Sequence, residues 1–574
     1  MKKLLILACL LLSAPVVFAQ TQPVLIRNIH IVDVENGKAK TASVLVENGE
    51  IRTVGRKAKA PAGGLVIEGE GKWLIPGMID THIHFFQSGG VYTRPDALDL
   101  RDYKSYEDEI EWIGSEAGDL LMRYLRAGVT TVFDVGGPMS NYDLREAYAD
   151  NATYPNIYLT GPLISPYQLP ALAGDDAPII EVHTAEEARA EVQRQLPRMP
   201  DFIKIWYLHR QSMPADSSYE MVKAAIAESH KHGLKVAVHA TQLHTAKLAI
   251  RAGADFLVHS VDNERVDDEF VGLLEDNDVT YIPTLVVHGN YIKTFTGTQT
   301  FSPEDFALAN PEALGSYYEL KSLSHPLLDT LRSSQAFSAS LINRSHASDS
   351  IRNYNLSLLS GKDVNIATGT DAGNIGTQHA SSYYDELAAM KEAGMSDADV
   401  LKASTLNAAR TLDLAEELGS IEKGKMADLV VLNANPLQDI MAVKEVAYVM
   451  KKGRVYIPDS IIDTSPEDLA QQQLNGYNAG DIDAFMAPYS DSVEIYVFPD
   501  QLRSKGKTAM REAYRQMFER LPDLHCELKN RIVMGNTVID KEYITGIPNG
   551  PLEAIAIYKI ENGKIAKVYF VRPE

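Results

Sequence analysis

Short apolar runs of strand length recur through the middle of the chain, separated by segments with helical periodicity. Eight such runs are predicted to be strands: residues 77–84, 128–135, 156–161, 201–207, 234–239, 255–259, 280–287 and 364–370. Repeated strand–helix units favour a parallel sheet, and eight of them are enough to close it. The pattern therefore predicts an α/β fold, a TIM-like (β/α)8 barrel over residues 76–414. The long stretch 288–361 is expected to be helical and to form a lid or substrate wall at the barrel mouth.

Different patterns precede and follow this middle part. Residues 20–75 and 415–458 contain short apolar runs with turn signals, such as Asn48-Gly49 between two of them, which is typical of a β-hairpin. We expect these two pieces to pair into one split β-sandwich domain. After a linker at 459–464, residues 465–574 show helical periodicity first and then a series of strands, which predicts a compact α+β domain.

The first 19 residues have the pattern of a secretory signal peptide. Two lysines follow Met1, an apolar stretch comes next, and Val17-Phe18-Ala19, with Val17 and Ala19 at the small-residue positions, precedes the expected cut. The sequence therefore predicts a periplasmic or secreted protein, with no later segment long and apolar enough to span a membrane. Removing Cys9 leaves only Cys526, so the mature chain cannot form an internal disulfide.

The charge balance narrows the class of partner. The formal net charge is -22, and the sequence has no concentrated basic patch. Such a chain repels nucleic acid and anionic membranes. We therefore expect a small-molecule substrate, and a homo-oligomer remains open.

Ionisable side chains recur in or at the ends of the predicted strands. In Asp80-Thr81-His82-Ile83-His84, the two histidines are two residues apart and project from one face of a strand. In a barrel of this kind, the carboxyl ends of all strands meet at one face. Packing explains such a set poorly, whereas imidazole and carboxylate ligands suit zinc. The predicted metal site therefore consists of His82, His84, Lys204, His239, His259 and Asp371.

These motifs resemble the amidohydrolase superfamily over about residues 22–458. The resemblance rests on residues 76–84, the strands ending at His239 and His259, Gly369-Thr370-Asp371 and the segments 403–410 and 419–430. It is nearest to the imidazolonepropionase-like group, which includes metallo-prolidases that cut Xaa-Pro dipeptides. From Ser465 onward the chain resembles the SnoaL-like, ketosteroid-isomerase-like cone fold, which we expect to be an accessory or dimerisation module.

The resemblance implies a binuclear centre with two divalent metal ions, zinc by expectation. Lys204 would be carboxylated and bridge them. His82, His84 and Asp371 would hold one ion, and His239 and His259 the other. A metal-bridging hydroxide would then attack an amide-type carbonyl of a peptide-like or N-acyl substrate, and Asp371 would transfer the proton to the leaving nitrogen.

Two other functions stay open at this point. One is a mononuclear hydrolase of a cyclic amide, resembling imidazolonepropionase, in which Lys204 is structural. The other is a catalytically inactive binding protein. For the substrate, Tyr207 and Arg210 follow the Lys204 strand and are predicted to bind it, since arginine can hold a carboxylate at two points. The mouth loops also carry His209, His288 and His379.

Overall fold

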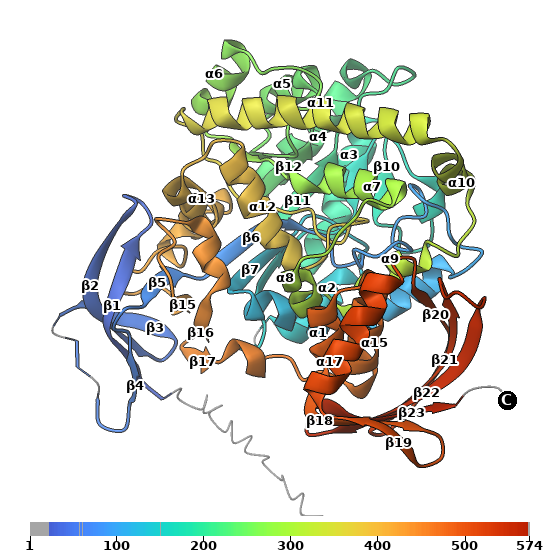
Figure 1. Cartoon of the computed structure of the whole chain (residues 1–574). Coiled ribbons are helices and arrows are strands. Elements are labelled where there is room, and N and C mark those ends of the chain that lie inside the picture. Colours follow the sequence, from blue (N-terminus) through green and yellow to red (C-terminus); the bar gives the residue numbers. More distant parts are fainter. Residues whose placement is uncertain (1–21, 57, 60, 150, 572–574) are drawn as a thin grey trace, which may run out of the picture.

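The computed structural model describes residues 22–56, 58–59, 61–149 and 151–571. The predicted signal peptide and Cys9 lie outside these residues. A central α/β body carries a β domain at one side and an α+β domain at the other (Figure 1). Within the described ranges, no helix is both long enough and apolar enough to cross a membrane.

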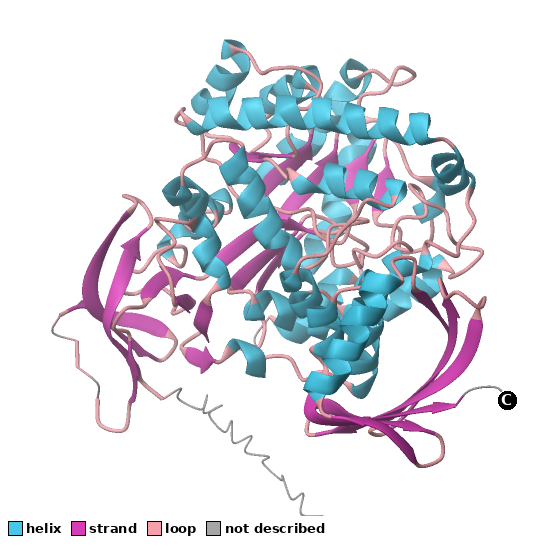
Figure 2. Ribbon diagram, in the orientation of Figure 1, coloured by secondary structure: helices cyan, strands magenta, loops and turns pink. Residues whose placement is uncertain are grey.

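The central body is a barrel of short parallel strands enclosed by helices (Figure 2). One parallel set joins the first three strands, and a second set continues the same wall. Their bounds are β6 (Met78–Ile83), β7 (Val129–Asp134), β8 (Asn156–Leu159), β9 (Leu163–Ser165), β10 (Ile179–Glu181), β11 (Phe202–Trp206), β12 (Lys235–His239), β13 (Phe256–Val258) and β14 (Thr280–Ile282). The two sets meet where the amide of Asp201 donates to the carbonyl of Leu159 at 3.0 Å.

Hydrogen bonds of the segment 364–372 close the ring. Ile366 bridges Tyr281 of β14 on one side, and Ala372 bridges Ile83 of β6 on the other. The amide of Thr81 also donates to the carbonyl of Thr368 at 3.0 Å. The predicted barrel is therefore confirmed, but the eighth strand expected at 364–370 is reduced to isolated bridges.

The strand expected at 280–287 was predicted too long. It ends at Ile282, because Pro283 offers no backbone N–H for the ladder and Thr284 has a left-handed φ of 43°. The chain then enters α7 (Val286–Thr296). Further helices fill the stretch that was expected to be a helical lid, namely α8 (Pro303–Leu308), α9 (Pro311–Glu319), α10 (Pro326–Ser333) and α11 (Gln335–Ser360).

The remaining barrel helices cover the outside of the strands. Their amphipathic faces pack on one large apolar core. The bounds are α1 (Tyr106–Arg126), α2 (Asn141–Tyr148), α3 (Ala185–Gln195), α4 (Ala215–Lys231), α5 (Leu243–Ala252), α6 (Asp268–Asp276), α12 (Ser381–Glu392), α13 (Asp397–Ala403) and α14 (Leu406–Thr411).

Segments from both ends of the barrel build the β domain together. Strand β5 lies between β1 from the N-terminal part and β15 from the part that follows the barrel, in the order β17-β16-β15-β5-β1-β2-β3 with β4 on β1. The bounds are β1 (Val24–Asp33), β2 (Lys38–Glu47), β3 (Glu50–Gly55), β4 (Leu65–Glu68), β5 (Trp73–Pro76), β15 (Leu429–Leu432), β16 (Val446–Lys451) and β17 (Arg454–Tyr456).

The C-terminal domain curves one sheet around three helices (Figure 1). The strand order is β19-β18-β23-β22-β21-β20, and the helices pack on its apolar inner face. The bounds are α15 (Pro466–Ala479), α16 (Ile482–Met486), β18 (Tyr489–Val497), β19 (Gln501–Lys505), α17 (Lys507–Arg520), β20 (His525–Met534), β21 (Thr537–Thr545), β22 (Leu552–Glu561) and β23 (Lys564–Val571).

Candidate metal centre and active site

Strand β6 carries the first two predicted ligands into the barrel. His82 is fully buried and His84 nearly so. The Asp80 carboxylate accepts hydrogen bonds from the Thr370 hydroxyl at 2.7 Å and the Thr370 amide at 3.1 Å. It thereby fixes β6 against the closing segment. Gly369 in that segment must lack a side chain, because a Cβ there would lie 2.8 Å from the Cβ of His82.

Neighbouring groups orient the candidate ligand histidines. The Nδ1 of His84 lies 2.7 Å from the carbonyl of Gly136, to which it can donate, leaving Nε2 with a free lone pair. The Nδ1 of His259 lies 2.7 Å from the Thr284 hydroxyl. Both nitrogens of the buried His82 have no hydrogen-bond partner among the described residues. A buried imidazole without a partner is costly, so this arrangement fits a metal ligand.

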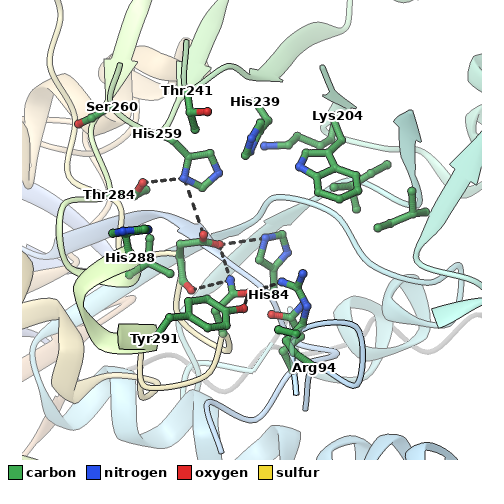
Figure 3. A pocket seen from close by; sticks show the side chains of 18 of the residues that line it. His84, Arg94, Lys204, His239, Thr241, His259, Ser260, Thr284, His288 and Tyr291 are labelled. Carbon is green, nitrogen blue, oxygen red and sulfur yellow. Dashed lines mark hydrogen bonds and ion pairs between the residues drawn. The ribbon is translucent and has the colours of Figure 1, made fainter. Parts of the chain in front are cut away.

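Asp371 lies at the centre of the histidines. Its Oδ1 is 3.3 Å from His82 Nε2 and 3.1 Å from His84 Nε2. Its Oδ2 is 3.8 Å from His259 Nδ1, too far for a hydrogen bond. His82, His259 and Asp371 each bring one ligand atom within 4.8 Å of the others. His84 and His259, both labelled in Figure 3, line the same cavity as Asp371.

Lys204 and His239 come from the adjacent strands β11 and β12. The ring of His239 lies 4.3 Å from that of His259, centroid to centroid, and both residues line the same cavity as Lys204. The Lys204 side chain is 1% exposed, and its Nζ has no hydrogen-bond partner in the described part of the chain. Burial lowers the pKa of Lys204 to about 7, against the opposing effect of Asp371.

Burial also favours the neutral form of three of the candidate ligand imidazoles. It lowers the pKa of His82, His239 and His259 well below the ordinary histidine value, and the nearby Lys204 lowers all three further. Metals bind neutral imidazole. The structure thus brings all six predicted ligand residues together, with donor types that suit divalent metal ions.

The backbone is strained at two of these residues. His259 has a φ of 76° and Asp371 a φ of 60°, in the left-handed region that few residues other than glycine adopt. Such conformations cost of order 1 kcal/mol and persist where the surrounding structure enforces them. His259 follows β13, Asp371 lies in the segment that closes the ring, and both line the cavity.

The two predicted substrate residues lie elsewhere. Tyr207 is buried, and its hydroxyl donates to the carbonyl of Ala215 at 2.7 Å. Arg210 is exposed, with its guanidinium 4.1 Å from the ring centroid of Tyr167. Neither is among the described residues that line the cavity. His379 is also buried away from it, between the Tyr124 hydroxyl and the carbonyl of Gln87, and His209 is exposed.

A cavity of about 300 Å³ is lined by five of the candidate metal ligands, His84, Lys204, His239, His259 and Asp371. Part of its lining is apolar and comes from β9, β10, β11 and the turn before β10: Leu163, Leu172, Ile179 and Trp206. The lining also includes two guanidinium groups, Arg94 and Arg352, together with His288 and Asp262. Of these, only His288 was singled out from the sequence. Arg94, ten residues after His84, lies in a polar loop with nothing in its local pattern to distinguish it.

Asn374 connects Arg94 to the metal centre. Its amide nitrogen donates to Asp371 Oδ1 at 2.8 Å, while its Oδ1 accepts from the Tyr291 hydroxyl at 2.8 Å and from Arg94. Arg94 in turn holds both oxygens of Asp96 at 2.7 Å. The Asp371 carboxylate is therefore fixed by a neutral amide whose own orientation is set by a cation. Three glycines around it (Gly369, Gly373 and Gly376) were the only sequence signal of such a tight turn.

Comparisons with known proteins agree with this geometry. The amidohydrolase family pattern matches residues 73–456, and a SnoaL-like domain matches residues 470–568. An imidazolonepropionase of Shouchella clausii is 25% identical over 465 residues, which cover 75% of this chain and 88% of that protein. An ochratoxinase of Aspergillus niger is 24% identical over 421 residues, which cover 67% of this chain and 75% of that protein.

A solved structure shares the fold. That of a Xaa-Pro dipeptidase with bound methionine superposes with a TM-score of 0.58 at 22% identity, and covers 76% of this chain and 100% of the other. The family match spans most of this chain and includes every residue of the candidate metal centre. The chain therefore belongs to the amidohydrolase family, a family of metal-dependent hydrolases that act on carbon–nitrogen bonds, and it carries a SnoaL-like domain at its C-terminal end.

Proposed function

We propose that the protein hydrolyses an amide-type bond in a peptide-like or N-acyl substrate that carries a free carboxylate, as a Xaa-Pro dipeptide does. Two divalent metal ions, zinc by expectation, would be held by His82, His84 and Asp371 and by His239 and His259. The names of the relatives, an imidazolonepropionase, an ochratoxinase and a Xaa-Pro dipeptidase, support a C–N bond as the target.

The observation that carries the binuclear proposal is the environment of Lys204. Its amine is buried at the cavity without a hydrogen-bond partner among the described residues, as are both ring nitrogens of His82. A buried ammonium without a counterion is costly, and two metal ions would repel it. The neutral amine would react with carbon dioxide and release one proton, giving a carbamate whose single negative charge, shared by two oxygens, would suit divalent ions in place of the ammonium.

Bound metal ions at this site would polarise the scissile carbonyl and lower the pKa of a water molecule. The chain supplies the proton transfer. Asp371 Oδ1 is held by Asn374, whereas Oδ2 lies 3.8 Å from His259 and makes no hydrogen bond with it. Oδ2 is therefore the oxygen that would accept the proton of the attacking water and pass it to the leaving nitrogen.

Two kinds of lining residue define the substrate. The apolar residues Leu163, Leu172, Ile179 and Trp206 can bury an aliphatic or aromatic group. Arg352, which also lines the cavity, is 4% exposed and pairs with Asp349. Its Nη1 lies 3.9 Å from Asp262, too far for a hydrogen bond, which leaves a donor for an anionic group.

A single-metal hydrolase of a cyclic amide is the second candidate. The observation that favours it is the compact trio His82, His259 and Asp371, which brings three ligand atoms within 4.8 Å without Lys204. In that case Lys204 would be a structural lysine. The metal content of the purified protein separates the two candidates.

The test is metal removal followed by reconstitution. We expect a chelator to abolish hydrolysis and zinc to restore it, with two ions per chain at full activity. Hydrolysis is to be screened with Xaa-Pro dipeptides, N-acyl amino acids and lactams. Full activity in metal-free protein would refute metal-dependent catalysis, and one ion per chain together with lactam turnover would establish the second candidate.

A further inference from the structure

Helix α9 lies between the C-terminal domain and the loop that follows His84. Figure 1 shows it next to α15, at the top of the C-terminal domain. Its residues Pro311, Ala313, Leu314, Gly315, Ser316 and Tyr317 are all buried. A short helix buried on both sides transmits any displacement of one neighbour to the other, because packed interiors have little free volume.

On one side, α15 contacts α9 through polar side chains that have fixed orientations. The Asn475 amide nitrogen donates to the carbonyl of Pro311 at 2.7 Å, and its Oδ1 accepts from Gln471 at 2.9 Å. Gln471 Oε1 accepts from Arg531 at 2.8 Å, which fixes the amide orientation. The fit is close, since a Cβ on Gly315 would lie 2.4 Å from Gln471 Nε2 and 2.9 Å from Asn475 Oδ1.

On its other side, α9 holds the active-site loop. The Tyr317 hydroxyl donates to the carbonyl of Gly89 at 2.8 Å, and the Ser316 hydroxyl accepts from the amide of Val91 at 3.1 Å. Val91, Tyr317 and Ile375 belong to one apolar cluster. The loop is thereby fixed to α9 by hydrogen bonds and by packing.

Gly89 in turn contacts residues 371–376, the active-site turn. Its amide donates to the carbonyl of Gly373 at 2.8 Å, and its carbonyl also accepts from the amide of Gly376 at 3.1 Å. Gly373 follows Asp371 by two residues, and a Cβ on it would lie 2.5 Å from the carbonyl oxygen of His84. Residues 371–376 therefore take their position partly from Gly89.

We propose that the C-terminal domain positions the active-site turn through α9, with Asn475 and Tyr317 as the positioning residues. Asn475 holds α9 in place through its hydrogen bond to Pro311. Tyr317 on α9 then holds Gly89, and Gly89 holds the turn that carries Asp371 and Asn374. Neither residue is among the described residues that line the cavity. The C-terminal domain would thus be a working part of the hydrolase and not only an accessory module.

The first test is hydrogen–deuterium exchange of the full chain, which needs no substrate. Asn475→Asp keeps the side-chain shape but replaces the donor with a carboxylate facing the Pro311 carbonyl. Loss of one net hydrogen bond should speed exchange in peptides covering 88–93 and 372–377 about five-fold or more. Asn536→Asp, in an exposed turn of the same domain, is the matched control and should leave both peptides at the wild-type rate.

A second pair of variants removes one hydroxyl each from neighbouring positions of α9. Tyr317→Phe should speed exchange in the same two peptides, whereas Tyr318→Phe should not, because its hydroxyl forms no hydrogen bond with the loop in the described structure. Both substitutions are conservative enough to fold even if Asn475→Asp does not. Combining Asn475→Asp with Tyr317→Phe should give less than the sum of the two effects, because both act through α9.

Once a substrate that the wild type hydrolyses is known, Asn475→Asp and Tyr317→Phe should each lower kcat for it several-fold, with KM and metal content unchanged. Wild-type exchange in both peptides for Tyr317→Phe, or for a folded Asn475→Asp, would overturn the proposal. Faster exchange with full kcat would also overturn it, since the turn would then not need the support of α9.

Discussion

Replacing Lys204 by methionine should change stability in opposite directions with and without metal. Burial lowers the pKa of Lys204 from its ordinary 10.5 to about 7, and its Nζ has no hydrogen-bond partner among the described residues. The full shift corresponds to about 4–5 kcal/mol against folding while the amine is protonated. Methionine has a similar length and no charge, so the metal-free variant should be more stable than the wild type by about 2–4 kcal/mol at pH 6.

The stability of the metal-free wild type should rise with pH, because the folded state releases the Lys204 proton at a lower pH than the unfolded state does. Below pH 7 the lysine is protonated in both the folded and the unfolded state, and the penalty is complete. Between about pH 7 and 10.5 the unfolded state binds more protons, so the stability of the wild type rises with pH. The advantage of Lys204→Met should therefore shrink between pH 6 and pH 9.

With zinc bound, the wild type should become more stable than Lys204→Met. If a Lys204 carbamate bridges two ions, zinc raises the melting temperature of the wild type more than that of Lys204→Met, which should also bind less metal and lose turnover. Lys204→Arg should not restore metal binding, because a guanidinium keeps its positive charge and forms no carbamate. A short carboxylic acid in the buffer should partly restore activity to Lys204→Ala.

The assay is thermal unfolding at pH 6 and pH 9, with chelator or zinc, combined with metal analysis of each protein. The reasoning fails if metal-free Lys204→Met is no more stable than the wild type at pH 6. The binuclear proposal fails separately if both proteins bind the same amount of metal and turn over alike. Lys204 would then be a core lysine.

Two further substitutions test the cavity. Arg352→Met should raise KM for carboxylate-bearing substrates about ten-fold or more, because it removes a buried anion-binding donor, and should leave KM for the neutral amides of these substrates unchanged. Arg210→Met, at an exposed arginine outside the cavity, is the control. Equal kinetics of the two variants would exclude Arg352 from substrate binding. Asn374→Leu should lower kcat about ten-fold with little change in metal content, because it removes the hydrogen bond to Asp371 Oδ1. An unchanged kcat would show that Asp371 does not need this hydrogen bond.

The sequence alone determined the features that depend on local periodicity. Two-residue spacing places His82 and His84 on one face of β6, and a lysine inside the apolar run Phe202–Trp206 has to be buried. Alternating strands and helices imply a barrel, and a barrel gathers its strand ends at one mouth. These local rules were sufficient to predict the fold class and to select the six residues that converge around the cavity.

Tertiary structure alone decided which loop residues join them. The rotation of the chain after β11 buries Tyr207 against Ala215 and leaves Arg210 at the surface, although both follow Lys204 closely. Arg352 and Asn374 enter the site from a distant helix and from a strained turn, and Asn475 reaches it only through α9. Backbone periodicity fixes the direction of a side chain within a helix or strand. Contacts between loops and helices far apart in sequence depend instead on how the whole ring of strands closes, and no local pattern encodes that closure.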